Sequence, residues 1–406
     1  MVVDAGLRSW DADEFRARAR AWLAEHGEPR VASAHPRVPP IAIEYEDGVR
    51  DAMAYQRELW AAGLAGLSLP SEYGGGGLAI EAQQILDEEM TGYEDPRTHL
   101  MISLGMCVPT LLAHGTDQQR RRWIAPILRG EENWCQLFSE PSSGSDLASL
   151  RTSAVRAEGG WLVTGEKVWN SGAHCSTRGL LLVRSASSGG DRGRSSLTLL
   201  GLDMATPGVD ARPLRNMTGV QGFCAVALSD VFVPDDDVIG AVGGGWQAAN
   251  TTLGSERTAI GAGASNRSPV SWQTLAARAA TTRATTDRVA RQEIAAFFVG
   301  ERVLALTAER MQSAATTSRP HPSLAKLARA ALAWQAVDAA TTFAGPLVLA
   351  LGADDDPASA AWPALVVGAP AQSIGGGTSE VMKNIVGERV LGLPREPRPR
   401  EETTNG

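Results

Sequence analysis

Residues 139–146 read SEPSSGSD, and residues 166–172 read EKVWNSG. The first stretch combines turn-forming residues with many hydroxyl groups and backbone donors. The second reads as the end of a strand that presents an indole, Trp169, and a hydroxyl, Ser171. The two stretches lie in the middle of the chain, where the pattern changes from helical to extended.

The composition excludes several classes of protein. The chain has 406 residues, 43% hydrophobic and 21% charged, which is typical of a globular protein with two or three domains. A net charge of −8 argues against a nucleic-acid-binding surface. No apolar run approaches the roughly 20 residues of a membrane helix, and residues 1–10 lack a signal-peptide core, so we expect no membrane insertion.

The four cysteines show no metal-binding or redox spacing. We therefore expect reduced thiols, no metal and a cytoplasmic location. The cysteines are Cys107, Cys135, Cys175 and Cys224.

Helical periodicity dominates the first third of the chain. Capping residues and glycines mark the ends of three helices. The first begins at Asp11 with Glu14 and ends at Gly27, and the second covers residues 52–62 and ends at Gly63. The third begins at Thr116 with Gln119 and ends at Gly130. The faces expected to be buried hold Phe15, Ala19, Trp22 and Leu23 in the first helix, and Trp123, Ile124, Ile127 and Leu128 in the third.

The middle of the chain reads as strands, and the last third reads as helices again. Short β-branched or alternating runs predict strands at 161–169, 179–184, 197–204 and 224–233, followed by a polar linker at 234–245. Helical periodicity then covers 246–264, 287–314 and 323–343. The acidic run at 354–356 predicts a loop.

This order of elements indicates an α+β protein with segregated helices and strands. We expect an N-terminal α-helical domain at 1–133, a middle antiparallel β domain at 134–240, a C-terminal four-helix bundle at 241–395, and a flexible tail at 396–406. Glycine-rich runs lack the strand-to-helix context of a dinucleotide fingerprint.

Six segments, in the order and at the spacing of the family, resemble the acyl-CoA dehydrogenase family, and the resemblance extends roughly from Phe15 to Pro394. They are residues 70–75, residues 115–119 with 130–131, the two stretches quoted above, residues 230–234, and residues 375–380 with 384–385 and 388–389. The resemblance implies FAD, α,β-dehydrogenation of an acyl-CoA thioester, and electron transfer to an electron-transfer flavoprotein. It also implies a homo-oligomer, a dimer or tetramer, or a related heteromer.

The family resemblance gives cofactor-binding roles to the two quoted stretches. The backbone around Phe138 and the Ser139 side chain would meet the flavin pyrimidine edge. Ser145 would contact the flavin phosphate or the substrate. Trp169 would pack on the isoalloxazine ring, and Ser171 would hydrogen-bond its N5 atom. For an isolated motif, the alternative is an ordinary polar turn and a core aromatic.

The C-terminal segment would hold the rest of the cofactor. Thr378 and Glu380 would lie near the FAD pyrophosphate and adenosine, where a glycine-rich turn opening a helix offers amides to phosphate. The amide of Gly376 would hold the thioester carbonyl. The alternative is a helix start with a favourably placed glutamate.

The catalytic base is expected on a helix. Many family members carry a glutamate where this chain has Gly376, which cannot abstract a proton. Another branch uses a Glu-Arg pair on a C-terminal-domain helix, and this chain has Glu256 and Arg257. We therefore assign Glu256 as the base that removes the α-proton while the β-hydride goes to flavin N5. Arg257 would contact CoA, and the alternative is a structural ion pair.

Two departures from the family pattern leave other functions open. Residues 285–292 lack the usual Arg-x-x-Phe-Gly segment, and residues 343–346 replace a Gly-Gly segment. These changes resemble a bacterial branch that handles bulky acyl groups, sometimes as heteromers. The alternatives are a dehydrogenase acting on an acyl thioester bound to a carrier protein, a flavin monooxygenase or oxidase, and an FAD-poor partner subunit.

Overall fold

The computed structural model describes residues 11–30, 45–185, 193–262, 270–281, 284–312, 321–344 and 357–395. The predicted acidic loop at 354–356 and the predicted tail at 396–406 both lie wholly outside this part. Contacts divide the described residues into two compact units: the first contains residues 11–30 and 45–259, and the second contains residues 260–262 and the described residues from 270 onward. None of the helices in the described ranges combines the length and hydrophobicity needed to span a bilayer.

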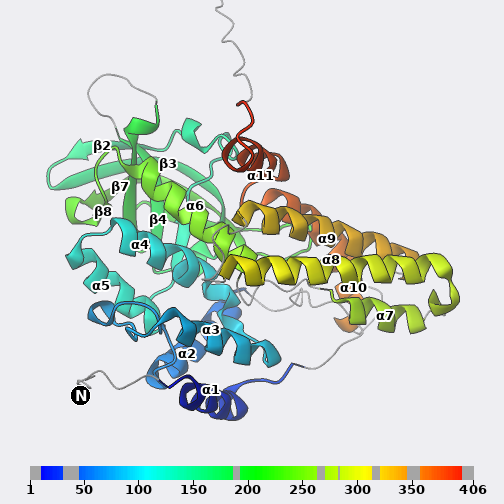
Figure 1. Ribbon diagram of the computed structural model, residues 1–406. Coiled ribbons are helices and arrows are strands. Elements are labelled where there is room, and N and C mark those ends of the chain that lie inside the picture. Colours follow the sequence, from blue (N-terminus) through cyan, green and yellow to red (C-terminus); the bar gives the residue numbers. More distant parts are fainter. Residues whose placement is uncertain are drawn as a thin grey trace, which may run out of the picture. The chain divides into compact units, whose positions relative to one another are not determined.

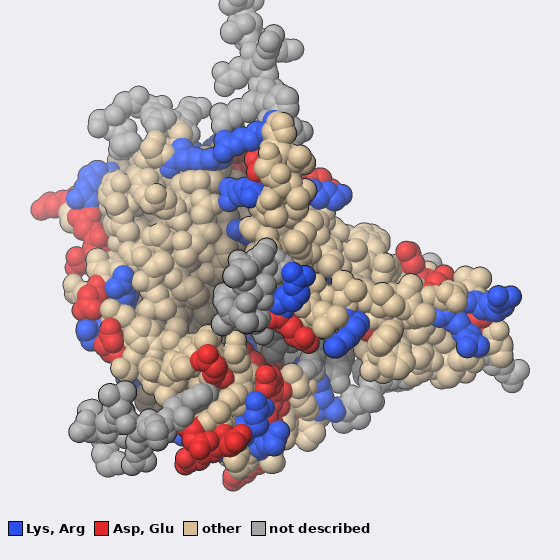
Figure 2. Space-filling model, viewed as in Figure 1, with Lys and Arg blue, Asp and Glu red and all other residues tan. Residues whose placement is uncertain are grey.

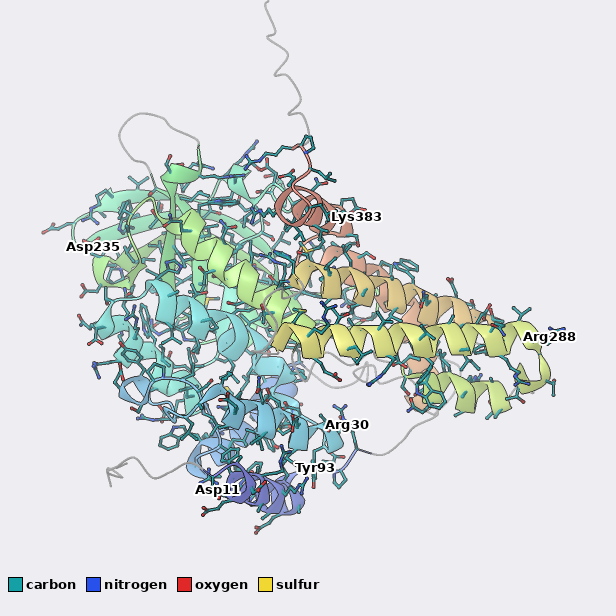
Figure 3. All side chains as sticks on the ribbon, in the orientation of Figure 1. Asp11, Arg30, Tyr93, Asp235, Arg288 and Lys383 are labelled. Carbon is teal, nitrogen blue, oxygen red and sulfur yellow. The ribbon has the colours of Figure 1, made fainter. Side chains whose placement is uncertain are left out.

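Helices open the first unit (Figure 1). They are α1 (Ala12–His26), α2 (Tyr45–Ala61), α3 (Ile80–Glu89), α4 (Val108–His114) and α5 (Asp117–Leu128). The predicted caps are confirmed. Asp11, labelled in Figure 3, accepts hydrogen bonds from the amides of Asp13 and Glu14. Thr116 and Gln119 form a reciprocal capping box.

The ends of these helices follow from glycine. Helix α2 begins at Tyr45, seven residues earlier than the periodicity predicts, and ends before Gly63, whose φ is +68°. The Leu64 amide donates to the Leu59 carbonyl, and the Gly63 amide donates to the Trp60 carbonyl. This pair of bonds is a Schellman motif, which satisfies the last carbonyls of the helix.

A single sheet of mixed direction forms the middle of the first unit. The strands are β1 (Trp134–Leu137), β2 (Ser153–Ala157), β3 (Gly160–Ser171), β4 (Arg178–Ser185), β5 (Leu197–Asp203), β6 (Val209–Leu214), β7 (Phe223–Pro234) and β8 (Val238–Ile239). Their order is β6-β7-β3-β2-β4-β5-β8, with β1 beside β4. Most pairs are antiparallel, as predicted, but β1 and β2 each pair with β4 in parallel.

The long strands were predictable, and the short ones were not. Strands β3, β4, β5 and β7 match the predicted runs within two residues. The predicted polar linker at 234–245 instead contains β8, which pairs with β5 through Leu199 and Ile239. A two-residue strand is too short to show the alternation on which strand prediction depends.

Helix α6 (Gly245–Ala262) packs mainly within the first unit. Ala248 and Ala249 are buried in the same apolar core as Trp123 and Trp134. These small side chains let the helix backbone approach the core closely. The domain boundaries expected from the sequence, with α6 assigned to the C-terminal domain, remain a prediction.

Helices make up the rest of the second unit. They are α7 (Trp272–Thr281), α8 (Arg288–Gln312), α9 (Pro322–Ala344), α10 (Pro357–Ile374) and α11 (Ser379–Ile385). The predicted helices at 287–314 and 323–343 correspond to α8 and α9. Helices α7 to α10 share one apolar core, whose aromatic members are Phe297, Phe343 and Trp362. The fold is therefore helices, sheet, then helices, as the sequence predicts.

We expect the G130A substitution to cost more stability than G159A. Both glycines have positive φ, +65° and +72°, so each alanine carries a backbone cost of about 1–2 kcal/mol. An alanine Cβ at 130 would also lie 2.5 Å from the Met53 carbonyl oxygen, whereas nothing lies within 4 Å at 159. Thermal unfolding of both variants measures the difference, and equal losses would contradict the close approach at Gly130.

Candidate functional site

The two quoted stretches lie side by side in the sheet region. The Val168 amide donates to the Ser139 carbonyl at 2.9 Å. The Asn170 side chain donates from Nδ2 to the Gln136 carbonyl at 2.8 Å. The structure therefore brings the Phe138–Ser139 segment beside the end of β3, which carries Trp169 and Ser171. The Phe138 side chain is buried in the core, so only its backbone can face a ligand.

Trp169 combines unusual backbone geometry with exposure. Its φ is +61°, and the pairing of β3 with β7 shifts register between Lys167 and Asn170. Its indole is 60% exposed and meets the Phe223 ring edge-to-face at 5.9 Å. A left-handed conformation is costly for a bulky residue and tends to persist where it serves a function. The bulge thus holds an open aromatic face beside Ser171.

The turn after Ser139 presents Ser145. The buried Ser143 donates its hydroxyl to the Asp146 carbonyl, and Ser149 donates to the same oxygen, both at 2.7 Å. The backbones of Glu140 and Ser143 exchange two hydrogen bonds, at 2.9 and 3.0 Å. These hydrogen bonds hold the turn together on its buried side, and Ser145 stays exposed at the tip of the turn.

The Ser139 turn and the end of β3 together form one surface, which we call the wall. A buried ion pair supports the wall from the protein interior. Lys167 Nζ lies 2.9 Å from Glu140 Oε1 and 3.1 Å from the Phe138 carbonyl oxygen, and the lysine side chain is 0% exposed. The Glu140 carboxylate also accepts hydrogen bonds from the amides of Arg151 and Thr152. One pair of side chains therefore connects the Ser139 turn, β3 and the start of β2.

Burial and pairing act against each other on these charges. Burial lowers the pKa of Lys167 to about 8, although Glu140 raises it. Burial by itself would raise the pKa of Glu140, but the Lys167 ammonium and the two backbone amides outweigh burial and lower it. Both groups are therefore charged at neutral pH.

An aromatic side chain packs behind the end of β3. The Gly172 amide donates to the Gly222 carbonyl at 2.8 Å. A Cβ at either glycine would lie 2.7 Å from the Tyr45 ring, so both positions need glycine for this approach. Burial is the main cause that raises the pKa of Tyr45 above its usual range. The first turn of α2 thus packs on the turn that follows Ser171.

Helix α6 carries Glu256 and Arg257, both half-buried. The buried Thr252 hydroxyl lies 2.9 Å from the hydroxyl of Thr110 in α4. Residues four apart share a helix face, so Glu256 lies on the face of α6 that turns toward α4. Arg257 lies about 100° further around the axis. The two side chains therefore point in different directions from the helix axis.

The C-terminal site residues belong to the second unit. Gly376 and Gly377 have φ of +67° and +91°, and Thr378 caps α11 by accepting a hydrogen bond from the Val381 amide at 3.3 Å. The exposed Glu380 has a lowered pKa, first because of its own backbone amide and then because of the Thr378 hydroxyl. Gly376 belongs to the second unit and Glu256 to the first, so their joint action on one thioester stays a prediction.

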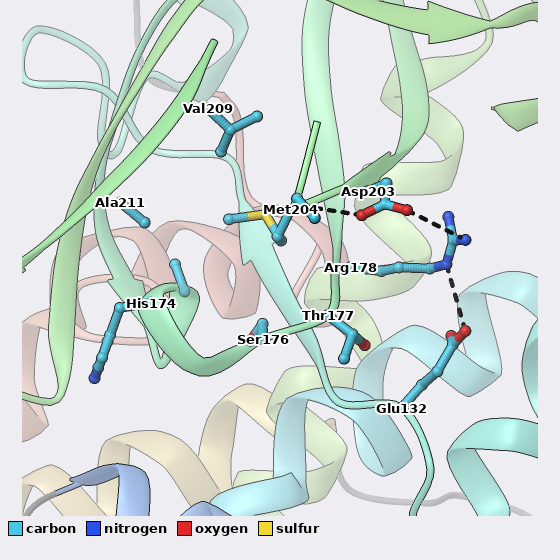
Figure 4. A pocket seen from close by; sticks show the side chains of 11 residues that line it. Glu132, His174, Ser176, Thr177, Arg178, Asp203, Met204, Val209 and Ala211 are labelled. Carbon is cyan, nitrogen blue, oxygen red and sulfur yellow. Dashed lines mark hydrogen bonds and ion pairs between the residues drawn. The ribbon is translucent and has the colours of Figure 1, made fainter. Parts of the chain in front are cut away.

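A cavity of about 590 Å³ lies elsewhere in the first unit (Figure 4). Arg178 lies 3.5 Å from Glu132 and 3.7 Å from Asp203 at its edge. None of the predicted site residues lines this cavity. Two of its lining residues, Ala173 and His174, directly follow the second quoted stretch, so the cavity adjoins that stretch without including a predicted site residue.

The wall fits a flat cofactor with a polar edge. It offers the exposed face of Trp169 and the hydroxyls of Ser139, Ser145 and Ser171. Within the described part of the chain, these three hydroxyls make no hydrogen bond to protein, so they are available to a ligand. The chemistry of this donor set suits the isoalloxazine ring of FAD.

Three residues of this site had no role predicted from the sequence. Glu140 and Lys167 stand inside the quoted stretches, and their opposite charges among small and apolar residues were the available signal. Tyr45 is far from both stretches in the sequence, and no local pattern marks it.

Comparison with known families covers most of the chain. "Acyl-CoA dehydrogenase, N-terminal domain" matches residues 9–131, the middle domain of the same family matches 135–231, and its C-terminal domain matches 243–391.

Individual relatives carry the same family name. Acyl-CoA dehydrogenase IpdE1 of Mycobacterium tuberculosis is 33% identical over 95% of this chain and 99% of its own length. Acyl-CoA dehydrogenase FadE34 of the same organism is 46% identical over 51% of this chain, and that match spans 29% of its length.

Solved structures share the fold. The "Tcur3481-Tcur3483 steroid ACAD" has a TM-score of 0.74 and 25% identity, covering 97% of this chain and 100% of that one. The ChsE4-ChsE5 complex from Mycobacterium tuberculosis has a TM-score of 0.74 and 23% identity, covering 98% and 100%.

We expect the K167M variant to be strongly destabilised and the K167M/E140Q double variant to be destabilised much less. Removing one partner of a buried pair leaves a buried charge alone, at a cost of about 3–5 kcal/mol, whereas removing both charges avoids that cost. Thermal unfolding measures both. The exposed pair Arg212–Asp210 provides a control, because R212M should change stability by less than about 1 kcal/mol. A double variant no more stable than K167M would contradict this account.

Proposed function

The chain belongs to the acyl-CoA dehydrogenase family, and from this premise we propose that it introduces an α,β double bond into a bulky acyl-CoA thioester. As a family member it is an FAD-dependent oxidoreductase. The observation that carries the proposal is the hydrogen bond from Val168 to Ser139, which joins the two flavin stretches into one wall beside the exposed Trp169.

The wall binds and orients the cofactor in this proposal. Trp169 would stack on the ring system, Ser171 would donate to its N5 edge, and the Phe138–Ser139 backbone would meet its pyrimidine edge. Ser145 contacts the phosphate or the substrate, and Thr378 and Glu380 lie near the pyrophosphate and adenosine. FAD supplies the acceptor for the β-hydride, chemistry that no side chain of the protein can perform.

Glu256 is the proposed base for the α-proton. Its place on the α6 face shared with Thr252 turns it toward α4 rather than toward open solvent, and a half-buried carboxylate next to an acyl chain is suited to accept a proton. The Gly376 amide donates to the thioester carbonyl, where negative charge develops as the α-proton leaves. Arg257, on another face of the helix, contacts the CoA moiety.

A bulky acyl group is the proposed substrate. The solved structure at 25% identity, Tcur3481-Tcur3483, is named a steroid ACAD, which supports a ring-containing acyl group here. We test the proposal by anaerobic titration of the purified chain with straight-chain, branched and steroid-derived acyl-CoA esters. Bleaching of flavin absorbance by the steroid-derived ester at lower concentration than by the others is the expected result.

Other results of the titration identify the alternatives. A yellow protein that no CoA ester bleaches, but that an acyl carrier-protein thioester bleaches, indicates a carrier-bound substrate. Rapid oxygen consumption by the reduced protein indicates an oxidase or monooxygenase. A colourless protein indicates the FAD-poor partner subunit.

An exposed apolar face on α8 supports association with another subunit. Val299, Val303 and Leu306 follow a helical spacing and are all exposed. Figure 2 shows uncharged side chains over much of the second unit on the side in view. The proposed occupant is a second acyl-CoA dehydrogenase subunit, identical or related. The similar solved structures Tcur3481-Tcur3483 and ChsE4-ChsE5 each carry the names of two proteins, which supports this occupant.

Two further features of the proposal follow from the family and the cysteines. An electron-transfer flavoprotein is the proposed electron acceptor, and the location is proposed to be cytoplasmic. Neither depends on the subunit arrangement.

We predict that E256Q retains FAD but is reduced by substrate about 10²–10⁴-fold more slowly, because a positioned base contributes about that factor. Anaerobic stopped-flow absorbance measures the rate. Glu158→Gln, at an exposed position in the β2–β3 turn, is the control and should reduce at the wild-type rate. Near-wild-type reduction of E256Q would exclude Glu256 as the base.

We predict that the V299E/V303E variant loses its partner subunit, because two buried and unpaired carboxylates would face an apolar interface. Light scattering after size-exclusion chromatography should show a smaller species. Gln118→Glu on the exposed face of α5 is the control. An unchanged mass would show that subunits associate through another surface.

A further inference from the structure

Lys167 occupies a distinctive place behind the proposed flavin wall. It stands on β3 two residues before Trp169, yet its side chain points inward and is fully buried. Both of its acceptors, the Phe138 carbonyl and Glu140 Oε1, lie in the segment that carries Ser139. A buried ammonium held this way acts on the backbone of that segment.

The geometry of one peptide group turns this contact into a directional effect. The Phe138 carbonyl and the Ser139 amide belong to the same trans peptide, so they point in opposite directions. Because Lys167 holds the carbonyl toward the interior, the amide points to the open side of the wall. Among the described residues, no protein acceptor takes this amide, while the Ser139 carbonyl is occupied by Val168.

The charges of the pair are not arranged symmetrically. The ammonium contacts the Phe138 carbonyl directly, whereas the Glu140 carboxylate is held by the amides of Arg151 and Thr152 on its other side. The positively charged member of the pair, Lys167, is thus the one in contact with the Phe138–Ser139 peptide group. An ammonium that polarises a carbonyl also strengthens the N–H of the same peptide as a donor.

We propose that Lys167 is a positioning residue for the cofactor: it fixes and polarises the Phe138–Ser139 peptide so that the Ser139 amide favours negative charge on the reduced flavin. This role rests on the proposed function of the wall as the flavin site. Burial that lowers the pKa of Lys167 to about 8 leaves the ammonium charged at neutral pH, with Glu140 as the ionised group that faces it.

The test separates the effect of removing the Lys167 charge from the effect of losing stability. The K167M/E140Q double variant removes the ammonium without leaving an unpaired charge, so it folds where K167M alone fails. Two quantities are measured on the purified protein: the dissociation constant of oxidised FAD, and the two-electron midpoint potential by anaerobic dye equilibration. R212M/D210N, an exposed pair on β6, is the matched control.

We expect the double variant to bind oxidised FAD with an affinity within a few-fold of wild type. Its preference for reduced over oxidised flavin should fall about tenfold, which lowers the midpoint potential by about 30 mV. The control should keep the wild-type potential. Restored stability with an unchanged potential would overturn the proposal and leave the pair a purely structural role.

Failure of the flavin site itself gives a different result. If the wild-type chain binds no FAD, the proposed function of the wall is wrong, and the role of Lys167 is excluded with it. If wild type and the double variant bind FAD with equal affinity and equal potential, the flavin site stands and only the Lys167 proposal is wrong.

Discussion

The buried ion pair between Lys167 and Glu140 is the interaction on which the arrangement of the wall depends. It is costly to form, because both charges leave water, and it is stabilised by hydrogen bonds from Lys167 to the Phe138 carbonyl and to Glu140, and from the Arg151 and Thr152 amides to Glu140. Those partners come from the Ser139 turn, β3 and the start of β2. A structural requirement to satisfy two buried charges therefore also fixes the backbone that would face the cofactor.

The open side of the same wall carries conformational strain rather than buried charge. Trp169 stays in a left-handed conformation at a bulge, and its indole remains mostly exposed. Neither feature contributes to the apolar core. The strain is supported by the hydrogen bonds of Val168 and Asn170 on one side, and by Tyr45 packed against Gly172 and Gly222 on the other. A rigid, supported surface of this kind is suited to hold a flat ring in one orientation.

Helix α6 shows how polar contacts inside a core set the direction of a functional side chain. Alanines let the helix approach the sheet region, and the Thr252–Thr110 hydrogen bond fixes its rotation. Rotation of a helix decides which residues face inward, so this buried contact also orients Glu256, four residues further along the same face, while Arg257 lies about 100° around the axis from it. The same helix carries both proposed functions, proton removal and CoA binding, without conflict between them.

The sequence by itself determined the features that depend on neighbours in the chain. Caps at Asp11 and Thr116, the glycine ends of helices, the long alternating strands and the family motifs are all local. Only the tertiary structure decided the rest: β8 within a polar segment, the two parallel pairings of β4, and the buried ion pair of Lys167 with Glu140. The reason is physical, because a two-residue strand or a buried charge is stabilised by partners distant in sequence, and no local pattern records which partners those are.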